Sequence, residues 1–116
     1  MTMRSRKLER SEWKPYSDRV SKALVGKRAE VEVVSLDLGR QVQAEWSPIY
    51  GLTFDPKDNL FEIALEGLDH LIRAPQEVHV LEGPEGLESV EIVDADGRRQ
   101  IVRLKEPLAL PPPEKA

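Results

Sequence analysis

The amino-acid sequence predicts an α+β domain: one N-terminal amphipathic helix packed on a curved antiparallel sheet, or partly open barrel, of seven to eight short strands. Two observations lead to this fold class. Apolar residues recur with the period of a helix only in the stretch before Gly26, and from Lys27 onward they recur at every second residue, as in a half-buried strand. Because many short strands share few residues, we expect the sheet to be strongly curved.

The predicted helix begins at Ser11, whose side chain suits an N-cap, and it ends before Gly26. Glu12 lies in the first turn, where the helix dipole favours an acidic group. The apolar positions share one helical face and comprise Trp13, Tyr16, Val20, Ala23 and Leu24. This face needs burial, so we expect the helix to cover one apolar face of the sheet.

The predicted strands form successive hairpins, because runs of alternating apolar and polar residues are separated by turn-forming residues. The clearest turn is Asp96-Gly97, a two-residue hairpin signal. In chain order, the predicted strands are 28–33 with 41–46, 50–54 with 61–65, 70–73 interrupted at Pro75 and resumed at 78–81, and 88–94 with 99–104.

Charge and composition divide the chain into a basic flexible arm at 1–10, a single α+β domain at 11–106 and a Pro-rich disordered tail at 107–116. The chain has 116 residues and a net charge of −4. The tail contains three consecutive prolines, which favour an extended, unpaired backbone. The arm has a net charge of +3, so the rest of the chain has a net charge of −7; the basic residues of the arm are Arg4, Arg6, Lys7 and Arg10.

Composition argues against most chemistry. The chain has no Cys, which excludes disulfides, thiolate metal sites and Cys nucleophiles, and it has only two His. The glycines form no phosphate-binding loop and no nucleophile elbow. No apolar run has the roughly 20 residues of a membrane helix, and no signal-peptide pattern opens the chain. We therefore expect a soluble cytoplasmic protein that is not an enzyme and binds no cofactor or metal and no membrane.

His70 and His79 are the only imidazoles, and Pro75 between them prevents a simple assignment to one strand face. We expect His70 to have a structural role, in which its ring nitrogens tie a strand end to a neighbouring loop. The alternative is a site for a small anionic ligand or a metal near His70 and Arg73, where a cation lies close to an imidazole in the sequence.

The chain contains an ordered series of short motifs. They are Ser11-Glu12-Trp13, Val31-Glu32-Val33-Val34, Asp37-Leu38-Gly39, Gly51-Leu52-Thr53-Phe54-Asp55-Pro56, and the His-x-Ile-x-x-Pro strand motif His70-Leu71-Ile72-Arg73-Ala74-Pro75. Their order and spacing resemble a bacterial family of small soluble domains, about 110 residues long, of unknown function. The resemblance covers most of residues 8–104 and implies a free-standing bacterial cytoplasmic domain, with no catalytic residues to carry over.

The leading functional prediction is a non-catalytic protein-interaction module, either self-associating or bound to another bacterial protein. It rests on the absence of a catalytic constellation and on sheet edges that need a partner or protection. The alternative is nucleic-acid binding, through the basic arm or through a barrel similar to Sm-like RNA-binding domains. Asp58-Asn59 fits the loop of those domains, but Gln41–Trp46 lacks their glycine, and the acidic body disfavours phosphate contacts.

Overall fold

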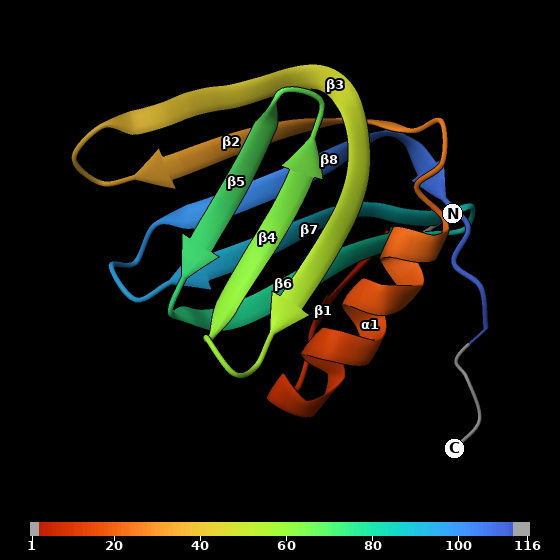
Figure 1. Ribbon diagram of the computed structural model, residues 1–116, viewed down its shortest axis with the longest axis horizontal. Helices are drawn as coiled ribbons and strands as arrows, with labels where there is room; N and C mark the ends of the chain where they lie inside the picture. The colour runs from red at the N-terminus through yellow and green to blue at the C-terminus, as the bar shows by residue number, and fades with distance from the viewer. Residues whose placement is uncertain (1–2, 113–116) are drawn as a thin grey trace.

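The protein is an eight-stranded antiparallel sheet with one helix, in the order β1-β6-β7-β8-β2-β3-β4-β5 across the sheet (Figure 1). The structure, a computed structural model, describes residues 3–112. The sheet is not closed into a barrel, because within residues 3–112 no further strand pairs with β1 or β5 at its two edges. The elements are β1 Arg4–Lys7, α1 Arg10–Lys22, β2 Arg28–Ser35, β3 Gly39–Asp55, β4 Leu60–Leu65, β5 Leu68–Arg73, β6 Pro75–Gly83, β7 Gly86–Asp94 and β8 Arg99–Leu108. The predicted α+β fold class is confirmed.

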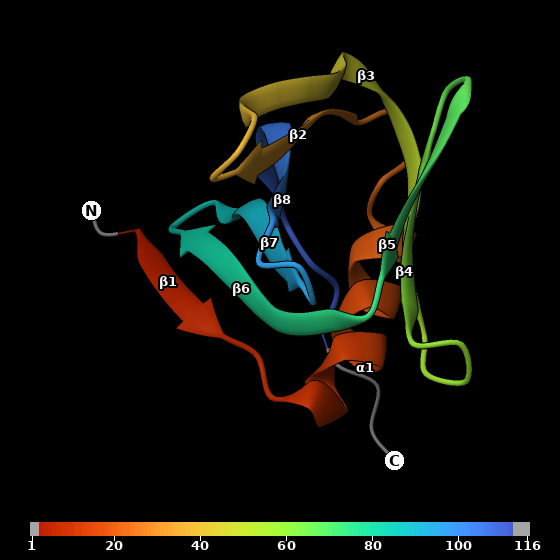
Figure 2. The ribbon, with the colours of Figure 1, turned by 90° about the vertical axis from the view of Figure 1, so that its left-hand side faces the viewer.

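The helix fills one end of the space between the two parts of the folded sheet, as predicted for its apolar face (Figure 2). Trp13 packs edge-on against Phe54, with ring centroids 5.2 Å apart, and Phe54 in turn lies 4.8 Å from Phe61. Ser21 fixes the helix to β3, because its hydroxyl donates to the Leu52 carbonyl at 2.6 Å and accepts the Leu52 N–H at 2.9 Å. These contacts hold α1 over the strands of the core.

The predicted N-cap is wrong by two residues. Helix α1 begins at Arg10 and its N-cap is Glu9, while Ser11 lies inside the first turn. Glu12, three residues after the cap, accepts the Glu9 backbone N–H at 2.9 Å. This bond belongs to a capping box, in which the third helical residue satisfies an N–H that the helix cannot. Ser11 misleads the prediction because serine is a common N-cap residue, whereas glutamate, the residue at the cap here, is an uncommon one.

The segment predicted as two strands around residues 46–50 is one long strand, β3, which bends between the two parts of the sheet. Its first half pairs with β2 and its second half with β4. At the bend, Trp46 has φ +48°, a left-handed conformation, and the register shifts between Ile49 and Gly51. A bulge of this kind turns a strand without ending it. The sheet therefore folds over at β3 to enclose the core.

Both ends of the described chain pair with the body of the domain. Part of the basic segment expected to be a flexible arm forms β1, which pairs with β6 along Arg4–Lys7. Part of the expected Pro-rich tail also pairs, because β8 extends to Leu108, and Pro111 accepts a bond from Arg19 Nε at 2.9 Å. The last four residues, 113–116, lie outside the described residues.

The face of β2 and β8 that turns away from the core carries an ion-pair network around Glu32, which is only 2% exposed. Arg103 Nη1 lies 2.5 Å from Glu32 Oε1, and Arg40 pairs with the other carboxylate oxygen. Burial raises the pKa of Glu32, but the bonds from Arg103 and Arg40 outweigh it and hold the pKa below its ordinary value. The network joins β2, β3 and β8. Within residues 3–112, no helix is long and apolar enough to cross a bilayer.

Candidate functional site

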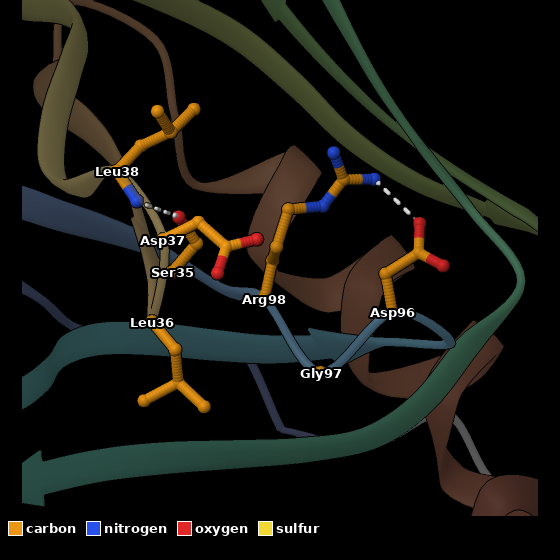
Figure 3. A pocket seen from close by; sticks show the side chains of 7 residues that line it. All are labelled: Ser35, Leu36, Asp37, Leu38, Asp96, Gly97 and Arg98. Atoms are coloured by element: carbon orange, nitrogen blue, oxygen red, sulfur yellow. Dashed lines mark hydrogen bonds and ion pairs between the residues drawn. The ribbon is translucent and has the colours of Figure 1, made fainter.

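Two turns at one end of the sheet enclose a hollow (Figure 3). The first turn joins β2 to β3, and its backbone is fixed by Ser35, whose hydroxyl accepts the Leu38 N–H at 3.1 Å. Gly39 follows with φ +67°, a conformation that glycine adopts at low cost. The second turn joins β7 to β8. The residues around the hollow are Ser35, Leu36, Asp37, Leu38, Asp96, Gly97 and Arg98.

Leu36 and Leu38 are the unusual residues of this hollow. Their exposures are 105% and 69%, and Figure 3 shows the two side chains pointing in opposite directions from the turn. Turns normally carry polar residues or glycine, so two leucines on either side of Asp37 are not explained by turn chemistry. We call the surface of Leu36 and Leu38 the leucine tip.

The second turn is fixed by Asp94, which is buried and accepts four hydrogen bonds. Its Oδ1 accepts the backbone N–H groups of Asp96 and Arg98, both at 3.0 Å. Its Oδ2 accepts Arg98 Nε and Gln100 Nε2, both at 2.9 Å. Burial raises the pKa of Asp94, but the bonds from Gln100 and Arg98 outweigh it and lower the pKa overall. A charged Asp94 therefore organises this end of the sheet.

His70 joins the same network from the other part of the sheet. Its Nε2 lies 2.6 Å from Gln100 Oε1. Because the Gln100 amide nitrogen donates to Asp94, its oxygen must be the acceptor, and His70 Nε2 must carry the hydrogen. The contact ties β5 to β8 across the open side of the sheet. The sequence predicts a tie from His70 to a loop, whereas the partner in the structure, Gln100, lies on strand β8.

The structure does not bring His70 and Arg73 together. They lie three residues apart on β5, so His70 faces inward, toward Gln100, while the exposed Arg73 lies on the opposite face. An anion held between these two side chains would need both on one face. His79 lies on β6 and pairs with Glu77 at 2.9 Å. Within residues 3–112, no three His, Asp or Glu side chains converge in a way that could hold a metal ion.

Two of the four cations in the predicted basic arm donate side-chain hydrogen bonds to other residues of the described chain. Arg6 pairs with Glu12 at 3.2 Å, and it also approaches Glu82 at 3.5 Å. Arg10 donates to Asn59 Oδ1 at 2.7 Å and stacks over Trp13, 4.7 Å from the ring centroid. The guanidinium groups of both residues thus help to dock the N-terminal segment and α1.

The other two cations of that segment are more open. Arg4 lies beside Glu82, Gly83 and Pro84 in a shallow hollow, and Lys7 is opposite His79 in the β1–β6 register. Arg4 and Arg6 therefore both lie near Glu82, and Lys7 lies near Glu77.

Sequence reasoning missed the leucine tip and the roles of Asp94 and Gln100. A signal for the tip was available, since Leu36-Asp37-Leu38 places two large apolar residues where a turn is expected. The Asp94 contacts are local, since Asp96, Arg98 and Gln100 lie within six residues of it, but no local signal reveals the contact of Gln100 with His70, 30 residues away.

Comparison with known proteins places the chain in a family. Residues 4–113 match the model of a family of unknown function, DUF5335. An uncharacterized protein of Aquifex aeolicus (strain VF5) is 40% identical over 110 residues, which cover 94% of this chain and 99% of the relative. No solved structure matches the chain. The predicted resemblance to a bacterial family of small domains is confirmed: the chain belongs to DUF5335, a family of unknown function.

Proposed function

We propose that this protein is a non-catalytic protein-interaction module of the bacterial cytoplasm and that it contacts its partner through the leucine tip. The observation that carries the proposal is the exposure of Leu36 and Leu38 at the end of the β2–β3 hairpin, beside a hollow. Single exposed leucines are common on protein surfaces and need no explanation. Here the two leucines lie on opposite sides of one projecting turn, so a partner that receives the turn in a groove would cover both side chains.

The energy available from this contact is large enough to matter. Burying one leucine side chain stabilises a complex by about 1.5–3 kcal/mol, so two leucines contribute roughly 3–6 kcal/mol before the costs of association. Asp37 and Asp96 give the rim a negative charge that Arg98 only partly offsets, which favours a partner with basic residues around an apolar centre.

The test compares the wild-type chain with the double variant Leu36→Ser, Leu38→Ser. Val25→Ser is the matched control, because Val25 is 90% exposed but lies in the loop after α1, away from the tip. Light scattering after size-exclusion chromatography, over a range of concentrations, measures self-association. We expect the double variant to abolish any association and the control to keep it, while circular dichroism shows the same fold for all three.

A partner other than a second copy is identified by a photo-crosslinking amino acid at position 38 or at position 25, introduced in the native host. The proposal expects a cross-linked protein from position 38 only. That protein, once purified, should bind the wild type at least about tenfold more tightly than the double variant. A wild-type chain that is monomeric throughout and gives no cross-link specific to position 38 contradicts the proposed function.

A further inference from the structure

The β5 strand, Leu68–Arg73, is a free edge of the sheet, and its pattern of charges fits one kind of ligand. We propose that this edge binds an extended peptide segment of a partner protein as a ninth, antiparallel strand whose outward residues read acidic–x–apolar–x–basic. The inference builds on the proposed interaction function, but it concerns a different surface from the leucine tip. Each can therefore fail without the other.

Strand register shows which backbone groups of β5 are free. The β4–β5 hairpin closes at Leu65 and Leu68, and the ladder continues without a bulge to the bond from the Ala74 N–H to the Asn59 carbonyl at 3.1 Å. In an antiparallel ladder, hydrogen-bonded pairs alternate with non-hydrogen-bonded pairs. Residues 68, 70, 72 and 74 therefore bond toward β4, and Asp69, Leu71 and Arg73 direct their N–H and C=O groups to the open edge.

The two free edges of the sheet differ in how they are protected. Strand β1 is four residues long and carries Arg4, Arg6 and Lys7, and short, cationic edge strands resist pairing with other chains. Strand β5 is longer and has an exposed apolar residue in its centre, since Leu71 is 42% exposed. Its inward side is anchored by Ile72, which is fully buried in the core. Edge pairing is therefore favoured at β5.

Charges on β5 define the ligand. Asp69 lies beside Glu62 of β4, and the repulsion between the two carboxylates raises the pKa of Glu62. Arg73 makes no ion pair among residues 3–112. A cation opposite Asp69 would relieve the repulsion, an acid opposite Arg73 would supply the missing partner, and an apolar residue would cover Leu71. In the antiparallel direction, these requirements give the acidic–x–apolar–x–basic order.

The sequence of β5 has this same order in Asp69, Leu71 and Arg73, so by charge alone a second copy of the chain would also match. The architecture argues against it. The β2–β3 and β7–β8 hairpins extend past β5 on its open side (Figure 1), and the symmetric pairing of two β5 strands would bring the hairpins of one copy into the body of the other. Figure 2, which faces that side, shows β5 as the outermost strand of its layer. A single extended segment avoids this collision.

The test uses two fluorescent seven-residue peptides with threonine at the first, third, fifth and seventh positions. The matched peptide has glutamate, valine and lysine at its second, fourth and sixth positions, and the swapped peptide exchanges the glutamate and lysine. Fluorescence anisotropy measures binding to the full-length protein. We expect the matched peptide to bind at least about tenfold more tightly, since two exposed ion pairs of about 0.7 kcal/mol each give tenfold and the like charges opposed in the swapped peptide add to the difference. N-methylation of the central valine should abolish binding, because it removes a backbone donor to β5.

The double variant Asp69→Arg, Arg73→Asp should reverse the preference and bind the swapped peptide more tightly. The matched control is Glu91→Arg, Arg99→Glu, which reverses a partly exposed cross-strand pair on β7 and β8, 2.6 Å apart in the wild type. This control should keep the wild-type preference.

Three peptide results would overturn the inference: no binding of the matched peptide at millimolar concentration, equal binding of both peptides, or binding that survives N-methylation. A wild-type dimer formed through β5, and kept by the double variant because its exchanged charges still match in a symmetric pair, would also overturn it. None of these results changes the expected effect of substitutions at the leucine tip, so the two proposals are separable.

Discussion

Replacing Asp94 with alanine should destabilise the domain far more than replacing an exposed residue of the same turn. Asp94 is buried, and its carboxylate accepts two backbone N–H groups, the Arg98 guanidinium and the Gln100 amide. In Asp94→Ala, the Gln100 amide would remain buried without its acceptor, which costs about 1–3 kcal/mol. Loss of the two backbone bonds adds roughly 1 kcal/mol. Arg98 is half exposed and returns to water at little cost.

The expected loss in the free energy of unfolding is therefore about 3 kcal/mol, which lowers Tm by roughly 10 °C in a domain of this size. Urea unfolding followed by tryptophan fluorescence measures it, because Trp13 is buried and reports on the core. The matched control is Asp96→Ala. Asp96 lies in the same turn, but its side chain is 76% exposed and contacts Arg98 only, so we expect a loss below about 0.5 kcal/mol.

The effect should also depend on pH, in a direction fixed by the lowered pKa of Asp94. An acid with a folded-state pKa below its unfolded value, about 3.9, contributes stability above that value. This contribution is lost as pH falls through the folded pKa. The difference between wild type and Asp94→Ala should thus be largest near neutral pH and shrink below about pH 4. A loss within 0.5 kcal/mol of the Asp96→Ala control, or a difference that does not shrink in acid, would refute the reasoning.

Three further predictions use the same unfolding assay. Gly86→Ala should lower the free energy of unfolding by about 3 kcal/mol or more, because Gly86 has φ +132° and an added Cβ would lie 2.3 Å from the Leu108 carbonyl oxygen. The control Gly67→Ala, at φ +75° with open space around it, should lower it by only about 1 kcal/mol, and equal losses would contradict the prediction. Trp13→Phe should change stability by less than about 1 kcal/mol, since the buried indole N–H has no acceptor among residues 3–112, whereas Trp13→Ala should cost about 3–5 kcal/mol. Glu62→Gln should raise the free energy of unfolding slightly at pH 7 and not at pH 3, because the raised pKa of Glu62 means that the fold disfavours its charged form. A lower free energy of unfolding for the variant at pH 7 would show that the carboxylate is stabilising.

Local patterns in the sequence predict the elements well where one periodicity continues without interruption. The apolar face of α1 is an example, since Trp13, Tyr16 and Val20 are all buried. The same reasoning fails on β3, where alternation predicts that Val42 and Tyr50 face the core and both are exposed. Register shifts in the β2–β3 and β3–β4 ladders reverse the phase of alternation there, and a bulge leaves no clear mark in a single sequence.

The site is less predictable than the fold, because its contacts join distant segments. Glu32 reads as a solvated residue on a polar strand face, but Arg103, 71 residues away, covers it. The tie between His70 and Gln100 depends on how far the sheet folds over at β3, and no spacing within either strand encodes that. The sequence predicts a structural contact for His70, but only the three-dimensional arrangement identifies Gln100 as its partner.

The order of strands has a consequence for how the chain folds. Strand β2 lies near the start of the chain, and its neighbour in the sheet, β8, is the last strand. The ladder that pairs Ala29 with Leu104 therefore joins the two halves of the sheet. During synthesis, β2 through β7 leave the ribosome before that ladder can form. We expect folding to be completed only after the whole domain has emerged, and refolding to be slow, on the order of milliseconds to seconds, because its rate-limiting contacts close long loops.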